Sequence, residues 1–333
     1  MSAIAEVHNM PQTVYAAQDG VLPEWRFLLV VINRSAEERV LTSVTTTLRE
    51  SGETVRRTRS GDTIENIVQG TPEVEPGGAV VLEIKDEGFA PARSVGLEMM
   101  FTGPRGTEVR TRQLVRLRPR KTAYLAFPVK GEWLVVNGRA ERHSYGGQFG
   151  FDLVAEKDRR LHEGGWQGNA ELEDYASHGR AIYAPADGVV VSAVDHYPDM
   201  APVPGGITFP GGPPPENREQ YVGNYLVMEL AAGVFLYLSH LMEDSVTVGS
   251  GDSVREGQMI ARVGNSGNTS GPHLHLELLD GAPHPSQVLT LQVAQSGLPA
   301  GFRGVLCRRE DGRTVSGRIV PRKMDVLVRE EFV

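Results

Sequence analysis

Short apolar and β-branched runs, separated by glycine, proline and asparagine, dominate the first third of the chain. Such runs have the length and composition of buried strands. The predicted strands cover residues 25–32, 40–48, 79–84, 95–101 and 109–115. The last two flank the turn-forming residues 103–106 and predict a hairpin. The pattern therefore predicts a mostly β protein with a β-sandwich domain, immunoglobulin-like, over residues 10–124. We expect a packing or spacer role for this domain.

A second set of predicted strands carries polar residues on otherwise apolar segments. Residues 148–154 alternate, with Phe149, Phe151 and Leu153 on one face and Asp152 on the other. A carboxylate inside so apolar a strand is costly unless it is paired, hydrogen-bonded or bound to a metal. Asp152 is therefore a candidate functional residue.

Histidines occur at the ends of other predicted strands. A glycine-rich turn at residues 264–271 leads into a strand with His273 and His275, which share one face because strand side chains alternate. Two adjacent imidazoles suit a zinc site, although a surface strand with two incidental histidines is the alternative. His240 ends the apolar strand 234–241, and His143 precedes Asp152.

These motifs together resemble a known family. His143 followed by Asp152, the Tyr-Leu-Ser-His at 237–240 and the Gly-Pro-His-Leu-His at 271–275 resemble the lysostaphin-type (LytM-domain) zinc metallopeptidases. Residues 183–190 and 248–258 resemble further parts of that family. The resemblance runs from about residue 125 to about residue 280. It implies an antiparallel β-sheet peptidase domain, predicted here at 125–300, before a β extension at 301–333.

The resemblance also implies the roles of five side chains. It makes His143, Asp152 and His275 zinc ligands, and His240 and His273 catalytic residues. Many members have three residues between the first His and the Asp, whereas this chain has eight, as in the beta-lytic branch. His162 and His178, expected in loops, are the alternatives to His143. No role is predicted for His8, His196 and His284.

Zinc would supply the nucleophile by activating water, and the two non-ligand histidines would transfer protons or stabilise charge. Which histidine performs which step is left open. Glu277 shares the face of His273 and His275, so it could orient a ligand. The simpler interpretation of Glu277 is a polar residue at the exposed end of its strand.

Length, charge and composition limit the classes of protein to which this chain can belong. A length of 333 residues favours two domains, and a formal net charge of −8 argues against nucleic-acid binding. The basic run at 116–121 is interpreted as a solvated strand end. Cys307 is the one cysteine, so no intrachain disulfide is expected. No membrane span is predicted, and the first ten residues lack the features of a signal peptide.

The expected function is a zinc endopeptidase that cleaves peptide bonds in bacterial peptidoglycan. Three alternatives are kept: an inactive relative that binds peptidoglycan or activates an amidase, a peptidase for intracellular proteins, and a self-inhibited precursor. A cell-envelope or secreted location is what the resemblance implies, and the oligomeric state is not predicted. The Gly- and Pro-rich segment 197–221 could wall a substrate groove or lie apart from it.

Overall fold

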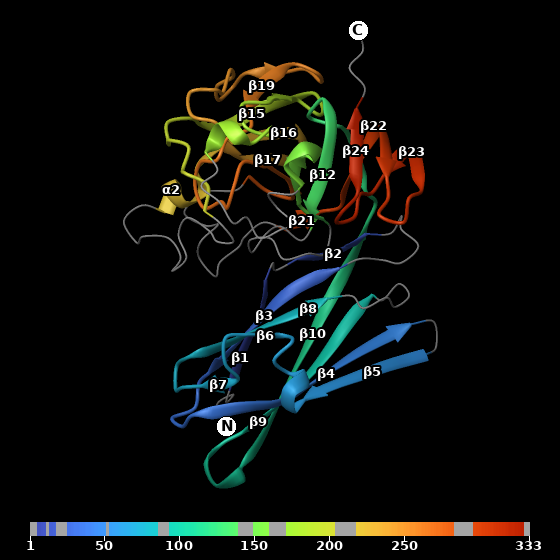
Figure 1. Ribbon diagram of the computed structural model, residues 1–333. Coiled ribbons are helices and arrows are strands. Elements are labelled where there is room, and N and C mark those ends of the chain that lie inside the picture. Colours follow the sequence, from blue (N-terminus) through green and yellow to red (C-terminus); the bar gives the residue numbers. More distant parts are fainter. Residues whose placement is uncertain are drawn as a thin grey trace. The chain divides into compact units, whose positions relative to one another are not determined.

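The computed structural model describes residues 5–10, 13–17, 25–50, 53–85, 93–138, 149–159, 171–203, 218–282 and 296–329. The chain forms two compact units, Met1–Lys121 and Thr122–Val333, and each is described here by itself. Both are built almost entirely of strands (Figure 1). The prediction of a mostly β protein is therefore confirmed.

Two sheets form unit 1. The first has the order β1 (Ala5–Met10), β3 (Arg26–Asn33), β8 (Ala79–Lys85) and β6 (Val68–Gln69). The second has the order β2 (Val14–Ala17), β10 (Glu108–Arg120), β9 (Ser94–Thr102), β4 (Arg39–Glu50) and β5 (Glu53–Ser60), and β7 (Glu73–Val74) pairs with β4. Short 3-10 turns, η1 (Gly61–Thr63) and η2 (Pro104–Gly106), follow β5 and connect β9 to β10.

One apolar cluster fills the space between these sheets. Phe27 and Leu82 come from the first sheet, and Val44 and Met99 come from the second; all four are almost fully buried. Two sheets that share one core make a β-sandwich. All five predicted strands and the hairpin lie where the alternation indicated them. The closer likeness to an immunoglobulin domain stays a prediction.

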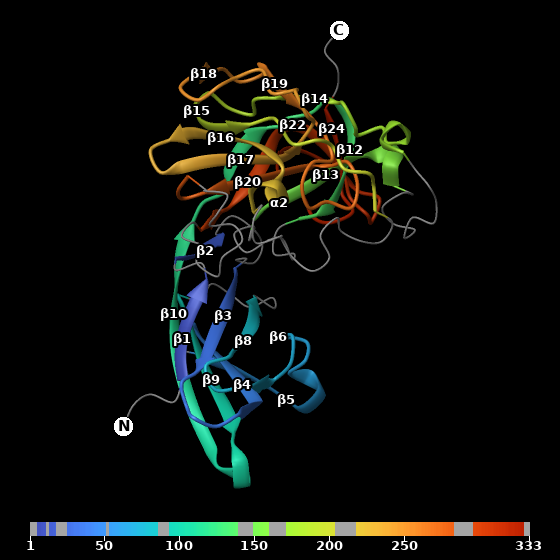
Figure 2. The same cartoon turned by 90° about the vertical axis from the view of Figure 1, so that its left-hand side faces the viewer.

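A large mixed sheet organises unit 2 (Figure 2). Its order is β11 (Ala123–Ala126), β22 (Ala300–Arg308), β24 (Val326–Arg329), β12 (Gly131–Asn137), β13 (Phe151–Ala155), β20 (Leu274–Leu279), β17 (Val234–Leu241), β16 (Asn224–Ala231), β15 (Gly188–Val194) and β18 (Ser253–Val254). β21 (Gly297–Leu298) pairs with β20, β23 (Thr314–Ile319) pairs with β22, and β14 (Ala181–Tyr183) pairs separately with β19 (Met259–Arg262).

Helical structure is sparse in unit 2. Among the described residues it comprises η3 (Glu156–Asp158), η4 (Leu172–Asp174) and the five-residue helix α2 (Arg218–Val222). No helix among the described residues is both long and apolar enough to cross a membrane.

The C-terminal strands belong to the sheet of unit 2. β24 pairs with β12, and β22 pairs with both β11 and β24. The segment predicted as an extension at 301–333 thus continues this sheet next to β12. The division of the chain into three parts at 124 and 300 stays a prediction.

The middle of this sheet is its most apolar part. Phe151 and Leu153 of β13 and Leu274 and Leu276 of β20 have no exposed surface. Trp133 is fully buried, and its indole Nε1–H donates to the carbonyl of Lys130 at 2.9 Å. Polar side chains on β13 and β20 therefore lie where water is largely excluded.

A buried carboxylate fixes the end of β13. Asp158 is 1 % exposed, and it accepts the backbone N–H groups of Ala176 and Ser177, both at 2.7 Å. The hydroxyl of Ser177 in turn accepts the N–H of Ala155 at 2.7 Å. This network holds β13 three residues beyond Asp152.

Replacement of Asp158 by Ala should lower the free energy of unfolding of unit 2 by about 3 kcal/mol, because two buried N–H groups would lose their acceptor. Denaturant unfolding measures the change. Asp174→Ala is the matched control, since the Asp174 carboxylate accepts a single exposed N–H, that of Glu171. Equal losses for the two variants would contradict the role given to Asp158.

Candidate functional site

The site centres on a carboxylate and an imidazole on neighbouring strands. The register of β13 and β20 sets Asp152 directly opposite His275. The Nδ1 atom of His275 lies 2.8 Å from Oδ1 of Asp152, and both residues are buried. This hydrogen bond meets the requirement that a charge inside an apolar sheet be paired.

A β-bulge brings a third polar group to this pair. The register of β12 against β13 shifts between Val135 and Asn137, so that Asn137 pairs with Asp152. The Asn137 amide donates from Nδ2 to Oδ2 of Asp152 at 2.7 Å. Bulges of this kind redirect side chains near functional sites. Both carboxylate oxygens of Asp152 are thereby engaged.

Glu277 lies on the other side of His275. It is 5 % exposed, so its interpretation as a residue at the exposed end of the strand is wrong. Its Oε1 lies 3.7 Å from Nε2 of His275, and within the described part of the chain its Oε2 is buried without a hydrogen-bond partner. Burial lowers the pKa of His275, but the carboxylates of Asp152 and Glu277 outweigh this effect and raise the pKa to about 10.

His240 reaches the same place from β17 through an unusual backbone conformation. Its φ is 61°, in the left-handed region that non-glycine residues seldom adopt and that clusters at functional sites. The ring centroid of His240 lies 4.7 Å from that of His273 and 6.3 Å from that of His275. Burial, together with the two neighbouring imidazoles, lowers the pKa of His240 to about 3.

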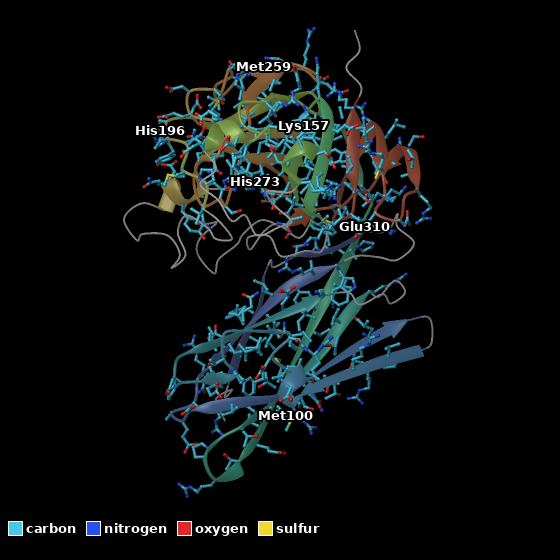
Figure 3. All side chains as sticks on the ribbon, in the orientation of Figure 1. Met100, Lys157, His196, Met259, His273 and Glu310 are labelled. Atoms are coloured by element: carbon cyan, nitrogen blue, oxygen red, sulfur yellow. The ribbon has the colours of Figure 1, made fainter. Side chains whose placement is uncertain are left out.

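His273 immediately precedes β20, whose first residue is Leu274. Its Nε2 lies 3.8 Å from Oδ1 of Asp152, so the ring faces the carboxylate. Figure 3 shows His273 among the strands of unit 2, with His196 at the side of the unit and well apart. The structure thus brings Asp152, His240, His273 and His275 together.

Backbone carbonyls define the tautomers of His240 and His273. Nδ1 of His240 lies 2.9 Å from the carbonyl oxygen of Ser266, and Nδ1 of His273 lies 2.9 Å from that of Gly271. A carbonyl can only accept, so each Nδ1 carries the proton and each neutral ring has its lone pair on Nε2. This assignment follows from the partners of each ring.

The remaining histidines lie elsewhere or outside the described residues. His143, the predicted third ligand, and His162 and His284 are outside them. His178 lies in a turn, as expected, but it pairs with Asp199, whereas the ring of His196 lies against Tyr197. Among the described residues, no three His, Cys, Asp or Glu side chains form a group that could hold a metal ion.

The pairing of His178 with Asp199 was not apparent from the sequence. The Asp199 carboxylate accepts from Nε2 of His178 at 2.8 Å and from the backbone N–H of Asn265 at 2.8 Å. Asn265 also donates from its side chain to the carbonyl of Met200 at 2.6 Å. The next residue, Ser266, supplies the carbonyl that holds His240, so this network supports the turn at 264–267.

Close packing also restricts the turn. A Cβ on Gly267, whose φ is 80°, would lie 2.6 Å from the backbone nitrogen of Gly223. Ser266 adds two side-chain hydrogen bonds, donating to Leu241 at 2.7 Å and accepting from Asn224 at 2.9 Å. The glycines of this motif are needed because two backbone segments meet without room for a side chain.

Comparison with known proteins identifies part of unit 2. Residues 172–285 match the description of peptidase family M23. The chain is 42 % identical over 62 residues to the peptidoglycan DD-endopeptidase ShyB of Vibrio cholerae, covering 19 % of this chain and 14 % of that protein. It is 31 % identical over 101 residues to ShyA of the same organism, covering 30 % of this chain and 18 % of that protein. The chain therefore spans less than a fifth of either relative.

Solved structures with detectable similarity include a zinc-containing peptidase from Vibrio cholerae, at 15 % identity, with coverage of 82 % of each chain and a TM-score of 0.29. Another is Csd3 from Helicobacter pylori, at 14 % identity, with coverage of 86 % of this chain and 77 % of that one and a TM-score of 0.28. TM-scores this low do not establish a shared overall arrangement.

Replacement of Asp199 by Ala should loosen the turn that holds His240, because two donors lose their acceptor. We expect a loss of about 2 kcal/mol in the free energy of unfolding. In histidine ¹⁵N NMR spectra, the Nδ1–H tautomer of His240 should give way to a mixture of both tautomers. Asp252→Ala is the control, since the Asp252 carboxylate accepts the N–H of Gly249 in a different turn. An unchanged His240 spectrum in the Asp199 variant would contradict the role of the network.

Proposed function

We propose that this chain, which contains a domain of peptidase family M23 of the LytM type, is a zinc-dependent endopeptidase that cleaves peptide bonds in bacterial peptidoglycan. One observation carries the proposal. Asp152, His240, His273 and His275 approach one another in unit 2 although they come from separate strands and turns. All four were predicted from their motifs as parts of one site.

The donor chemistry of the described residues fits zinc. A carboxylate oxygen of Asp152 and an imidazole nitrogen of His275 face each other, and both atom types are common zinc ligands. Together with His143 they would make the three protein ligands that are typical of catalytic zinc sites. When bound, zinc would act as a Lewis acid that polarises a carbonyl group and makes water more nucleophilic.

Two neighbouring side chains would hold this pair of ligands in position. Asn137 holds the second carboxylate oxygen of Asp152, and the Glu277 carboxylate lies on the Nε2 side of His275. Residues that orient metal ligands in this way fix their geometry and raise their basicity. We therefore assign positioning roles to Asn137 and Glu277.

His240 and His273 would perform the proton transfers. Because each Nδ1–H donates to a backbone carbonyl, the basic nitrogen of each ring is Nε2. One ring would accept the proton of the attacking water and the other would donate to the leaving amine or to the developing oxyanion. Two rings whose centroids are 4.7 Å apart can serve both ends of one peptide bond.

The assignment of peptidoglycan as substrate is supported by the names of the relatives. Both curated relatives are peptidoglycan DD-endopeptidases, and both matches involve only part of their length. The formal net charge of −8 gives no general electrostatic attraction to anionic wall polymers, so recognition would depend on local contacts at the site.

Two variants separate the metal ligands from the catalytic histidines. His275→Ala should abolish both zinc binding and peptidoglycan cleavage. His240→Ala should keep stoichiometric zinc yet lose cleavage by a factor of about 10² to 10⁴, the usual contribution of a general acid or base. Elemental analysis gives the zinc content, and release of soluble fragments from purified peptidoglycan gives the activity.

His196→Ala provides the histidine control, because its ring packs on Tyr197 and it should change neither quantity. Loss of zinc in the His240 variant would overturn this division of roles. If zinc-loaded wild-type protein leaves peptidoglycan intact but cleaves unfolded protein, the substrate is protein and not peptidoglycan. Absence of any cleavage would favour a binding module.

Removal of the metal should be reversible. Treatment with a chelator should abolish cleavage, and zinc should restore it, while the circular dichroism spectrum stays that of a β protein. The reason is that the sheet around the site is held by apolar residues such as Phe151 and Leu276, which do not depend on the metal. Unfolding on chelation, or full activity without metal, would contradict the proposal.

A further inference from the structure

The outer face of one sheet in unit 1 carries a row of arginines. β10 is thirteen residues long, and its side chains alternate between the core and the surface (Figure 2). Val115 and Leu117 point into the core, where they are 2 % and 4 % exposed. Side chains at the alternate positions therefore project from the outer face. Four of these are exposed arginines, which together form the arginine row: Arg110, Arg112, Arg116 and Arg118.

The arginine row is a line of positive charge on an acidic protein. Strand residues rise by about 3.4 Å each, so arginines at successive outward positions are about 7 Å apart and the whole row is about 27 Å long. Glu108, at the start of β10, is the acidic residue on the same face of this strand. The chain as a whole has a formal net charge of −8, so the row is a local exception to the charge of the protein.

One carboxylate of the next strand lies beside the row. The register of β9 against β10 sets Glu98 opposite Arg112. Its carboxylate lies 2.7 Å from Nε of Arg112 and 3.6 Å from Nε of Arg110. The hydrogen bond from Arg112, with the charges of Arg110 and Arg56, outweighs burial and lowers the pKa of Glu98. A single carboxylate thus faces three guanidinium groups, and positive charge remains in excess.

The other end of the row is available for a ligand. Within the described part of the chain, Arg116 and Arg118 make no hydrogen bond or ion pair with another side chain. Between the two ends of the row lies Leu114, which is 61 % exposed and pairs with Gly96 on β9. A Cβ on Gly96 would meet its nearest neighbours at 3.6 Å, so packing does not require a glycine there. The middle of the row therefore offers an apolar contact beside a position without a side chain.

We propose that the arginine row of unit 1 binds peptidoglycan by pairing with the free carboxylates of its stem peptides. This binding role rests on the proposed function and adds a surface that would hold the polymer, apart from the catalytic residues of unit 2. Peptidoglycan is an extended polymer with carboxylates at repeated intervals. A guanidinium group binds a carboxylate through two parallel hydrogen bonds, so a line of arginines complements a line of carboxylates.

The same face is less suited to other polyanions. Single-stranded nucleic acids bind where exposed aromatic rings stack on the bases. β4, β5, β9 and β10 contain one aromatic residue, Phe101, and it lies in the core. A membrane surface requires a continuous apolar face beside the basic residues. Leu114 is the one strongly exposed large apolar side chain among the described residues of unit 1.

The test is sedimentation with purified, insoluble peptidoglycan. The reference is the full chain with His240→Ala, so that the polymer is not cleaved. Adding Arg116→Gln and Arg118→Gln should weaken binding about five- to ten-fold, the effect of losing two exposed ion pairs. Peptidoglycan with amidated carboxylates should bind both proteins equally. Added salt should reduce the difference between the proteins, because it screens exposed charges.

Two further variants guard against a general effect of charge or folding. Lys85→Gln with Arg105→Gln is the matched control, since it removes two exposed positive charges from β8 and from the β9–β10 turn. Glu98→Gln should tighten binding about two-fold, because it removes the carboxylate that pairs with Arg110 and Arg112. A misfolded protein could not produce this gain.

Several results would overturn the binding role. These are unchanged binding after replacement of Arg116 and Arg118, an equal loss on amidated peptidoglycan, and the same loss in the control. Glu98→Gln that weakens binding would also do so. Binding of DNA or of anionic lipid vesicles through the same arginines, without binding of peptidoglycan, would overturn the choice of partner.

Failure of the proposed function looks different. With active protein, replacement of Arg116 and Arg118 should raise KM for suspended peptidoglycan by the same factor, with kcat nearly unchanged. If zinc-loaded wild type does not cleave peptidoglycan, the endopeptidase assignment fails. Sedimentation then decides the arginine row alone: binding that depends on Arg116, Arg118 and the carboxylates supports it, and binding that depends on none of them overturns it.

Discussion

A carboxylate and an imidazole face each other across β13 and β20, at the part of the unit 2 sheet where apolar side chains exclude water. In that setting an unpaired charge would destabilise the fold. The hydrogen bond of 2.8 Å between Asp152 and His275 pairs both groups and so reduces the free-energy cost of burying them. The strand register sets this contact. Every other group at the site is arranged around it: Asn137 on the second carboxylate oxygen, Glu277 beyond the imidazole, and His273 facing Asp152.

This arrangement concentrates negative charge around one imidazole. Asp152 and Glu277 together outweigh burial and keep His275 protonated in the metal-free protein, whereas His240 close by stays neutral because burial and the other imidazoles oppose its charge. The rings of His240 and His275, whose centroids are 6.3 Å apart, thus have pKa shifts in opposite directions. Two carboxylates lie beside His275, whereas at His240 burial and the imidazoles of His273 and His275 outweigh the hydrogen bond to the carbonyl of Ser266.

Much of the fold could be predicted from the sequence because strand alternation is a local signal. The strands of unit 1, the hairpin at 103–106 and the strands carrying His240 and His275 lie where the pattern of apolar residues indicated them. The strand carrying Asp152 begins at Phe151, inside the predicted range 148–154. The burial of Trp133 was also predictable, since a large ring in an apolar segment seldom remains exposed.

Features that depend on contacts between distant segments were not predictable. Glu277 has the local pattern of an exposed residue. Its strand, β20, lies between β13 and β17 in the sheet, and its burial depends on these distant segments. Asp199 lies in an irregular stretch with no motif, so its support of the turn through Asn265 has no local signal. The positive φ of His240 likewise has no local signal; the backbone and the ring of this residue are both hydrogen-bonded to the distant residues Gly264 and Ser266.

The C-terminal strands illustrate how pairing within a sheet brings distant parts of the chain together, since Met324 and Asp152 line the same pocket. β24 bonds to β12, and β12 bonds to β13, so the turn before β24 lies two strands from Asp152. Side chains fix the turn as well, because the buried Asp325 carboxylate pairs with Arg309 and accepts the backbone N–H of Arg322. Asp152, His240 and His275 lie on other strands of the same sheet, β13, β17 and β20, so this turn comes near them without belonging to those strands.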